Sequence, residues 1–358
     1  MSADGPQVHR KLRPDPGLLF GLARRVWIGD CRASRPTSNP HSHAGKLQSV
    51  LEIVTPVFGI VIIGWMAARA GVFGQAAIDG ISDFVFTIAI PLLLFRTLAT
   101  AGLPDDIPWD VLLSYYLGIY AVFAIGMVIA AVVFRKGLSE QGAFAGSCCF
   151  SNTVLLGIPI ILAVFGEAAS IPLFLVIGVH NAVLLPLLVI VLGMGQSRTG
   201  AMLGGLRETL LDLVRNPLVI GLAGGVVYGR IGPPLPGPVD DIIRMLGTAG
   251  APVALFALGG TLARYRVSGY IGQALVISVL KLVVQPFAVW MLATHVFGLE
   301  PTWAWVVTLL SAMPTGVNVF IFANRYGAGT ATAGTTIVLS TALGAGTVSG
   351  LIWLIEHS

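Results

Sequence analysis

Long apolar segments recur along almost the whole chain, and they restrict its fold more than any other feature of the sequence. Between Leu47 and Leu354 there is room for ten segments of the roughly 20 residues that a helix needs to cross a lipid bilayer. Hydrophobic residues make up 55% of the chain and charged residues only 11%, a balance that a water-soluble core could not bury. We therefore predict an all-α membrane protein with ten transmembrane helices. The predicted spans are residues 48–69, 78–99, 109–134, 141–165, 169–193, 211–229, 239–262, 268–296, 303–323 and 330–354.

The charges in the connections predict how these helices are oriented. Connections after odd-numbered spans carry nine Lys and Arg, whereas those after even-numbered spans carry three. Because Lys and Arg are enriched on the cytoplasmic side, we expect the odd-numbered connections in the cytoplasm and both termini outside. The tail at residues 1–46 opposes this orientation, since it holds eight of the 21 Lys and Arg. We give more weight to the five independent connections, and we expect the tail to be a basic, disordered segment.

The two halves of the membrane region resemble each other in sequence. Five spans occupy residues 48–193 and five occupy 211–354, and a short cytoplasmic linker at 194–210 joins them. Because five is odd, the second half enters the membrane from the opposite side, which is the inverted-repeat architecture of many secondary transporters. A constant shift of 161 residues pairs Pro56 with Pro217, Gly64 with Gly225, Asp79 with Asp240, Pro91 with Pro252 and Phe95 with Phe256.

Polar and helix-breaking residues interrupt the fourth and ninth spans at mid-depth. The fourth contains Asn152 and Pro159, and the ninth contains Pro314, Gly316 and Asn318. Proline lacks an N–H donor, and unwound backbone in a membrane is tolerated only where protein or water satisfies it. The N-terminus of each half-helix carries a partial positive charge that suits a carboxylate. One such span could be a simple kink with polar caps, but two at corresponding positions predict broken helices that cross at a binding site.

The residues around these interruptions resemble the auxin efflux carrier family. The string Asn152-Thr-Val-Leu-Leu-Gly-Ile-Pro159 is similar to the family's crossover motif. In the ninth span Pro314-Thr-Gly316, followed by Phe320-Ile-Phe-Ala323 and Tyr326, is similar to the partner crossover. Ile90-Pro91-Leu-Leu-Leu-Phe95 in the second span fits the same family.

This resemblance covers residues 48–354, and it implies two inverted five-helix repeats with broken crossover helices. It also implies a scaffold domain, an elevator-like transport domain and an anionic substrate at the crossover. The bacterial branch of the family is similar to malonate and other organic-acid carriers, which implies the bacterial inner membrane. Plant exporters have a long central loop, whereas the linker at residues 194–210 is short, so regulation through a large phosphorylated loop is not expected.

We predict a substrate site made of the interrupted spans and one lysine. Lys281 is the clearest charge at membrane depth, and it could bind the substrate carboxylate or pair with carbonyl groups at an interrupted helix. His180 could titrate during proton coupling or serve as hydrogen-bonded packing, and Asn181 is a weaker polar candidate. The predicted substrate-binding residues are Asn152, Thr153, Gly157, Pro159, Pro314, Gly316, Asn318 and Lys281, and the coupling candidates are His180 and Gln285.

Other functional classes find little support in the sequence. Hydrolase, P-loop and dinucleotide motifs are absent, so we expect no enzyme activity and no cofactor. Cys148 and Cys149 are interpreted as packing residues, because no metal-ligand spacing is present. The net charge of +4 reflects the tail and the helix ends and does not indicate nucleic-acid binding. Gly221, Gly225 and Gly229 predict a close helix contact, either within the chain or in a homodimer.

We therefore expect a secondary active transporter for small organic anions, either malonate-like dicarboxylates or auxin-like carboxylates. A proton, a sodium ion or the substrate gradient would drive it. A sodium-coupled bile-acid-type symporter is an alternative, although its sodium sites would need more acidic and polar side chains near the crossover. A membrane sensor that does not transport is another alternative, which a fused cytoplasmic signalling domain would support.

Overall fold

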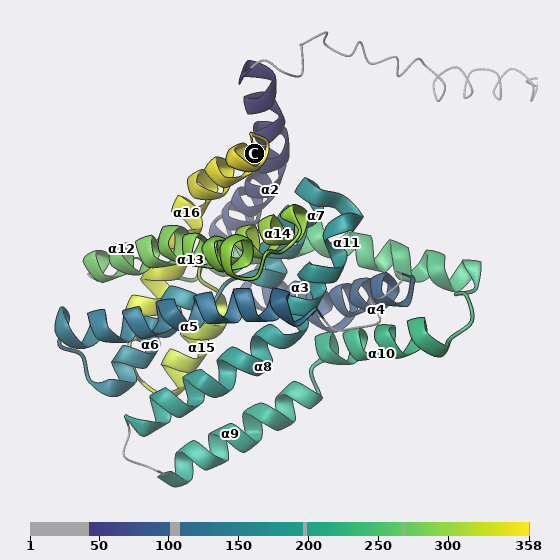
Figure 1. Cartoon of the computed structure of the whole chain (residues 1–358). Coiled ribbons are helices and arrows are strands. Elements are labelled where there is room, and N and C mark those ends of the chain that lie inside the picture. Colours follow the sequence, from purple (N-terminus) through teal and green to yellow (C-terminus); the bar gives the residue numbers. More distant parts are fainter. Residues whose placement is uncertain (1–42, 101–107, 196–198, 266, 268–269, 358) are drawn as a thin grey trace, which may run out of the picture. The chain divides into compact units, whose positions relative to one another are not determined.

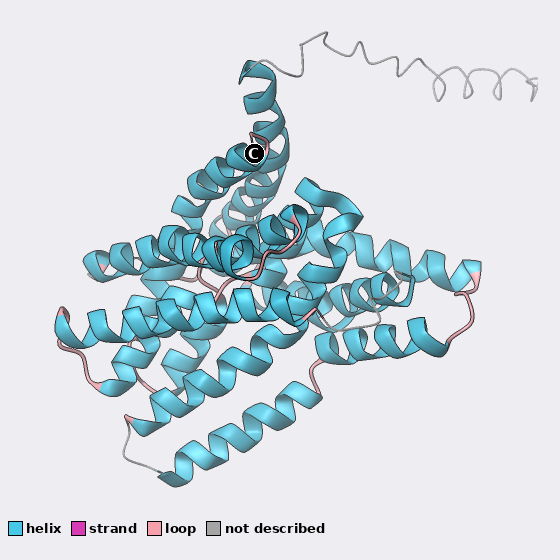
Figure 2. Cartoon of the chain, viewed as in Figure 1, coloured by secondary structure: helices cyan, strands magenta, loops and turns pink. Residues whose placement is uncertain are grey.

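The structure is a computed structural model, and it describes residues 43–100, 108–195, 199–265, 267 and 270–357. Within these residues the secondary structure is helical, and the only β-type pairing there is one isolated bridge (Figure 2). The chain divides into the units Met1–Gly45 and Lys46–Ser358, and the fold below is that of the second unit. The predicted basic tail lies almost entirely outside the described residues.

The helices follow one another with short connections (Figure 1). Those before residue 195 are α2 (His43–Arg69), α3 (Gln75–Phe84), α4 (Ile90–Thr100), α5 (Trp109–Val132), α6 (Leu138–Cys149), α7 (Ile158–Phe165) and α8 (Ser170–Met194). Those after residue 198 are α9 (Thr199–Val214), α10 (Pro217–Ile231), α11 (Gly237–Leu262), α12 (Ile271–Val279), α13 (Gln285–Met291), α14 (Pro301–Ser311), α15 (Val317–Arg325) and α16 (Thr330–Ile355). A 3-10 turn at Gly166–Ala169 joins α7 to α8. Wider π-helical turns lie at Val85–Ala89, Thr153–Gly157, Leu280–Val284 and Leu292–Val296.

Among the described residues, seven helical segments are long and apolar enough to cross a membrane, or eight if the bent pair formed by α9 and α10 counts as one span. The sequence predicts ten, and part of the difference lies at the interrupted spans. Helices α6, α14 and α15 contain 12, 11 and 9 residues, so each is too short to cross a bilayer by itself. The helical run Thr153–Met194 joins the end of the predicted fourth span to the fifth. The described residues therefore form a helical membrane protein with several spans.

The linker that the sequence predicts as a short loop, residues 194–210, is largely helical. Helix α9 occupies most of it and ends at Val214, and α10 begins at Pro217 rather than at residue 211. Asn216 separates the two helices, because its side-chain oxygen accepts a hydrogen bond from the backbone N–H of Leu218 at 2.9 Å. Pro217 fits the first turn of α10, where no intrahelical N–H bond is needed.

Glycines allow α10 to pack directly on the backbone of α4. A Cβ atom at Gly221, Gly225 or Gly229 would lie 2.5–2.6 Å from a carbonyl oxygen of α4, far closer than a side chain can approach. All three residues of the predicted small-xxx-small pattern thus serve a contact within the chain. They therefore give no support to the predicted homodimer.

One of these contacts has a counterpart in the other half of the chain. The Cβ position of Gly225 in α10 faces the carbonyl oxygen of Phe95 in α4, and that of Gly64 in α2 faces the carbonyl oxygen of Phe256 in α11. The shift of 161 residues takes Gly64 to Gly225 and Phe95 to Phe256. A two-fold relation between the two halves would produce such a reciprocal pair of contacts.

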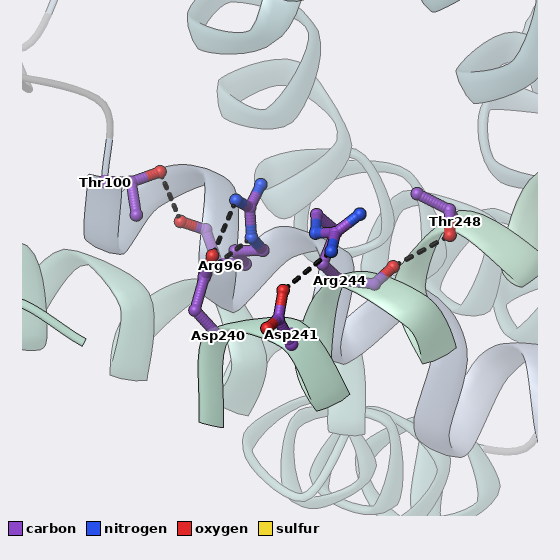
Figure 3. Close-up of polar contacts among 6 residues, drawn as sticks. All are labelled: Arg96, Thr100, Asp240, Asp241, Arg244 and Thr248. Carbon is purple, nitrogen blue, oxygen red and sulfur yellow. Dashed lines mark hydrogen bonds and ion pairs between the residues drawn. The ribbon is translucent and has the colours of Figure 1, made fainter. Parts of the chain in front are cut away.

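Ion pairs fasten both ends of the α3–α4 segment to α11. Near the end of α4, Arg96 binds Asp240 in the first turn of α11 through two bonds, Nε to Oδ1 at 2.6 Å and Nη2 to Oδ2 at 3.0 Å (Figure 3). At the opposite end, Arg264 lies just after α11 and binds Asp79 in α3. Two parallel N–H bonds to one carboxylate fix the relative orientation of the helices as well as their distance.

A second set of helices packs around the two interrupted spans. Helix α5 packs against α6 and α13, α6 also packs against α8, and α12 packs against α16. We call these helices, together with the turn at Thr153–Gly157 and helices α7, α14 and α15, the crossover group. We call α2, α3, α4, α10 and α11, together with the turn at Val85–Ala89, the flanking group. The two groups meet where α11 lies against residues 153–165 and where α8 approaches α4 and α10. The interrupted spans are therefore held among crossover-group helices, with one side facing the flanking group.

Candidate functional site

Two extended segments pair with each other where the fourth and ninth spans are interrupted. Helix α6 ends at Cys149 and α14 ends at Ser311, and each chain then leaves the helical path. The backbone N–H of Asn152 donates to the carbonyl oxygen of Pro314, and that of Gly316 donates to Phe150, both at 2.8 Å. This antiparallel pair satisfies polar backbone groups that would otherwise lack partners inside a membrane.

Hydroxyl side chains complete the hydrogen bonding of this pair. Thr315 Oγ1 donates to the carbonyl oxygen of Ser147 at 2.8 Å, near the end of α6. The backbone N–H of Thr315 donates to Ser340 Oγ of α16 at 3.1 Å. Thr315 and Ser340 were not among the predicted site residues, because hydroxyl residues are common in helices and their partners lie far away in sequence.

A wider helical turn follows the first extended segment. The N–H of Gly157 donates to the carbonyl oxygen of Asn152 at 3.1 Å, a spacing of five residues, and α7 then begins beside Pro159. A Cβ at Gly157 would lie 2.7 Å from a methyl carbon of Leu310, so this glycine permits close packing against α14. Pro314 packs against Gly344 of α16 in the same manner. These residues shape the interruptions.

A small cavity of about 60 Å³ lies beside the paired segments. It is bounded by both interruptions, by α8 and, through Phe86, by the flanking group. The cavity-lining residues include the predicted Asn152, Thr153, Gly316 and Asn318, whereas Gly157, Pro159, Pro314 and Lys281 are not among them. The complete lining is Phe86, Phe150, Ser151, Asn152, Thr153, Val154, Leu155, Asn181, Gly316, Val317 and Asn318.

The electrostatics of this cavity come from backbone and amide groups, since its lining residues carry no charged side chain. The helical run that continues into α7 starts at Thr153, and α15 starts at Val317, so two helix N-termini border the cavity. Each helix N-terminus contributes a partial positive charge of roughly half an elementary charge. Asn318 Nδ2 donates to Asn181 Oδ1 at 3.4 Å across the cavity wall. The cavity can therefore accept an anion without a buried cationic side chain in its lining.

Lys281 is completely buried behind the crossover and lies in the wide turn between α12 and α13. Its Nζ donates to Ser151 Oγ at 2.8 Å, to Gln285 Oε1 at 2.9 Å and to the carbonyl oxygen of Ser311 at 2.5 Å. Gln285 Nε2 in turn donates to the carbonyl oxygen of Cys149 at 3.2 Å. The sequence leaves two roles open for Lys281, binding the substrate carboxylate or pairing with carbonyl groups. In the structure its amine contacts carbonyl and hydroxyl oxygens at the interrupted helices.

His180 of α8 is buried against Phe150, with ring centroids 4.9 Å apart. The rings of Tyr115 and Tyr116 from α5 also contact it, at 6.0 and 6.4 Å. Neither imidazole nitrogen makes a well-aligned hydrogen bond to another described residue. The structure thus brings His180 close to the crossover without giving it an ion-pair partner among the described residues.

A larger cavity, about 840 Å³, lies elsewhere, along α13, α14 and α16. Aliphatic and aromatic side chains, including Phe287, Trp290 and Trp305, dominate its lining. It has neither paired amide side chains nor helix N-termini at an interruption. For a small anion the smaller cavity at the crossover offers the better chemistry despite its size.

The chain is similar in sequence to known membrane proteins. The family described as "Membrane transport protein" matches residues 49–352. A protein of Rhizobium meliloti (strain 1021) named "Putative malonate transporter" is 27% identical over 316 residues, which cover 87% of this chain and 97% of that protein. "Auxin efflux carrier component 8" of Arabidopsis thaliana is 24% identical, over 77% of this chain and 89% of its own length. "Lysosomal cholesterol signaling protein" of Mus musculus is 26% identical over 75% of this chain, but only 33% of that protein is covered.

Proposed function

Because the chain belongs to the auxin efflux carrier family of membrane transport proteins, we propose that it is a secondary active transporter for small organic anions. The observation that carries the proposal is the convergence of two helix N-termini, at Thr153 and Val317, on one small cavity. Asn152 and Asn318 line the same cavity, one from each interrupted span, and their amides can donate to an anion. Thr153 and Gly316 complete the substrate contacts.

The substrate that fits best is a short dicarboxylate of the malonate type. The two helix N-termini give each of two carboxylates a partly positive partner, and their summed charge is roughly one elementary charge. A cavity of about 60 Å³ favours a compact acid over an indole or a steroid. The malonate-transporter name of the Rhizobium relative points in the same direction.

The remaining predicted residues support this site without touching the substrate. Gly157, Pro159 and Pro314 hold the interruptions open, and Lys281 positions Ser151, which lines the cavity. His180 is our candidate for a protonatable group, because it contacts Phe150 at the crossover. Gln285 links Lys281 to the end of α6.

We further propose that the chain has ten spans in two inverted repeats, residues 48–193 and 211–354, joined by the linker at 194–210. The reciprocal glycine contacts and the ion pairs at both ends of α3–α4 support this arrangement. In an elevator-type cycle, the crossover group would move as a body against the flanking group. Phe86 would then be left behind on the fixed side of the cavity. The bacterial inner membrane, with both termini outside, is the proposed setting, and labelling of single cysteines introduced into the connections would test it.

The test is transport into proteoliposomes. We expect a saturable current with malonate, weaker currents with longer dicarboxylates, and none with indole-3-acetate, each measured with and without sodium and a pH gradient. Asn152→Ala and Asn318→Ala should each weaken apparent affinity roughly 10- to 100-fold, since a hydrogen bond to a charged group contributes about 1.5–3 kcal/mol. Asn324→Ala is the matched control, because Asn324 lies on α15 but outside the cavity.

Three results would redirect the proposal. Unchanged affinity in both cavity variants would remove the crossover as the binding site. If the folded and inserted protein transports no acid, the sensor alternative is favoured instead. The name of the mouse relative, a signalling protein, points in that direction. Uptake of a bile acid that strictly requires sodium would favour the symporter alternative.

A further inference from the structure

We propose that the Lys281 ammonium is a tethered cation that fills a monovalent-cation site between the two broken helices. The transporter would then work without a free cation bound at this place. Removal of the amine would open the site to a small free cation such as sodium, potassium or ammonium. This inference concerns cation binding alone and does not depend on which anion is carried.

Oxygen atoms surround the Nζ of Lys281. Three oxygens lie 2.5–2.9 Å from it: Ser151 Oγ, Gln285 Oε1 and the carbonyl oxygen of Ser311. Two of them can only accept hydrogen bonds, and the Ser151 hydroxyl itself donates to Ser311 at 3.3 Å, so it too acts as an acceptor toward the lysine. Three accepted bonds require three N–H donors, which only the charged ammonium has. An all-oxygen shell of this kind is also what hard metal cations prefer.

The charge of the Lys281 ammonium is balanced by helix C-termini. No carboxylate of the described residues lies within ion-pair distance of Lys281. Helix α14 ends at Ser311, whose carbonyl contacts Nζ directly, and α6 ends at Cys149, whose carbonyl is reached through Gln285. Each helix C-terminus carries roughly half a negative elementary charge, so the two together roughly offset one ammonium.

The oxygen shell around Lys281 also lies where a coupling cation is expected relative to the crossover. In broken-helix transporters generally, half-helix N-termini face the anionic substrate, while half-helix C-termini and unwound carbonyls coordinate the coupling cation. Here the N-termini at Thr153 and Val317 border the cavity, and the C-terminal ends of α6 and α14 face Lys281. Lys281 thus lies on the side of the crossover where such transporters bind a free cation. Ser151 contacts Lys281 on that side and also lines the cavity that faces the anion.

The experiment measures thermal unfolding of purified protein in detergent, without substrate, at constant ionic strength in choline, sodium, potassium or ammonium chloride. We expect Lys281→Ala to gain a few degrees in Tm, saturably, in at least one small cation relative to choline, because a ligand that binds only the folded state stabilises it. Wild type should show no such difference. Lys281→Met is the matched control, since its side chain fills the same space but offers no charge and leaves no room for an ion. Lys136→Ala controls for the loss of a lysine elsewhere in the chain, since Lys136 is partly exposed and pairs with Glu140.

Several outcomes would overturn the proposal. A folded Lys281→Ala protein with the same Tm in every salt would show that the oxygen shell binds no free cation. A specific, saturable sodium response of wild type would show that the lysine does not fill the site. If Lys281→Ala aggregates in choline, recovery of monodisperse protein in a small cation supports the inference, and aggregation in every salt overturns it. Because substrate is absent throughout, failure here would leave the transport proposal standing, and failure of transport would leave this result standing.

Discussion

The contact between α10 and α4 leads to a prediction in which neighbouring residues should behave in opposite ways. Gly224 and Gly225 are adjacent, and both are replaced by alanine. A Cβ at Gly225 would lie 2.6 Å from the carbonyl oxygen and 2.9 Å from the Cα of Phe95, which are backbone atoms that cannot move aside cheaply. A Cβ at Gly224 would lie 3.5 Å from a ring carbon of Phe95, which is ordinary contact.

The magnitude follows from two opposing terms. Replacing a glycine by alanine inside a helix stabilises by about 0.5–1 kcal/mol when the new methyl group fits. Overpacking of a close contact destabilises by about 1–3 kcal/mol. Gly224→Ala should therefore be neutral or stabilising, and Gly225→Ala should be destabilising. Because the gain in helix propensity is common to both variants, they should differ by the overpacking cost alone, roughly 1–3 kcal/mol.

The assay is thermal unfolding of the purified variants in one detergent, and the order of their Tm values is the result. The mirrored contact gives a second pair. Gly64→Ala should behave like Gly225→Ala, whereas Gly59→Ala on the same helix should behave like Gly224→Ala, because no atom lies within 4 Å of its Cβ position. Equal Tm values for Gly224→Ala and Gly225→Ala would refute the close packing of α10 on α4. A harmless Gly64→Ala would refute its counterpart.

Two further predictions concern charges. In a double-mutant cycle, Arg96→Ala and Asp240→Ala should show a small favourable coupling in unfolding free energy, because two hydrogen bonds join the side chains and solvent screens the pair. Independent effects of the two substitutions would contradict this ion pair. Glu300 accepts hydrogen bonds from the backbone of Thr302 and Trp303 at the start of α14, and the bond from Thr302 lowers the pKa of Glu300. The pKa of Glu300 is therefore lower in the folded than in the unfolded protein. The stabilisation from its hydrogen bonds is fully present above about pH 4.3, and it is lost as pH falls through the folded-state pKa. The Tm advantage of wild type over Glu300→Gln should shrink in that acid range, and an advantage independent of pH would contradict the capping role.

Local sequence chemistry was enough to locate the interruptions. Asn152, Pro159, Pro314 and Gly316 disfavour a continuous apolar helix, and the structure leaves the helical path at residues 150–152 and 312–316. The same reasoning placed Asn152 and Asn318 near a common site, and both line the cavity. Their roles in transport remain predictions until the variants are measured.

Other parts of the site could not be found in this way. Ser151, Thr315 and Ser340 make the bonds that hold the crossover together, yet serine and threonine occur throughout such helices and no local pattern marks these three. The sequence also does not predict the helix at residues 199–210, because this segment is less apolar than a span and its pattern is that of a loop.

The sequence by itself determined that the chain is a helical membrane protein with several spans and where two of its helices are interrupted, because apolar length and proline chemistry act over a few residues. Only the tertiary structure decided which partners those residues meet. It turned Gly221, Gly225 and Gly229 toward α4 of the same chain, and it placed the amine of Lys281 among oxygens contributed by residues 4 to 130 positions away. Such contacts depend on how separate helices pack, and that information is spread over the whole chain.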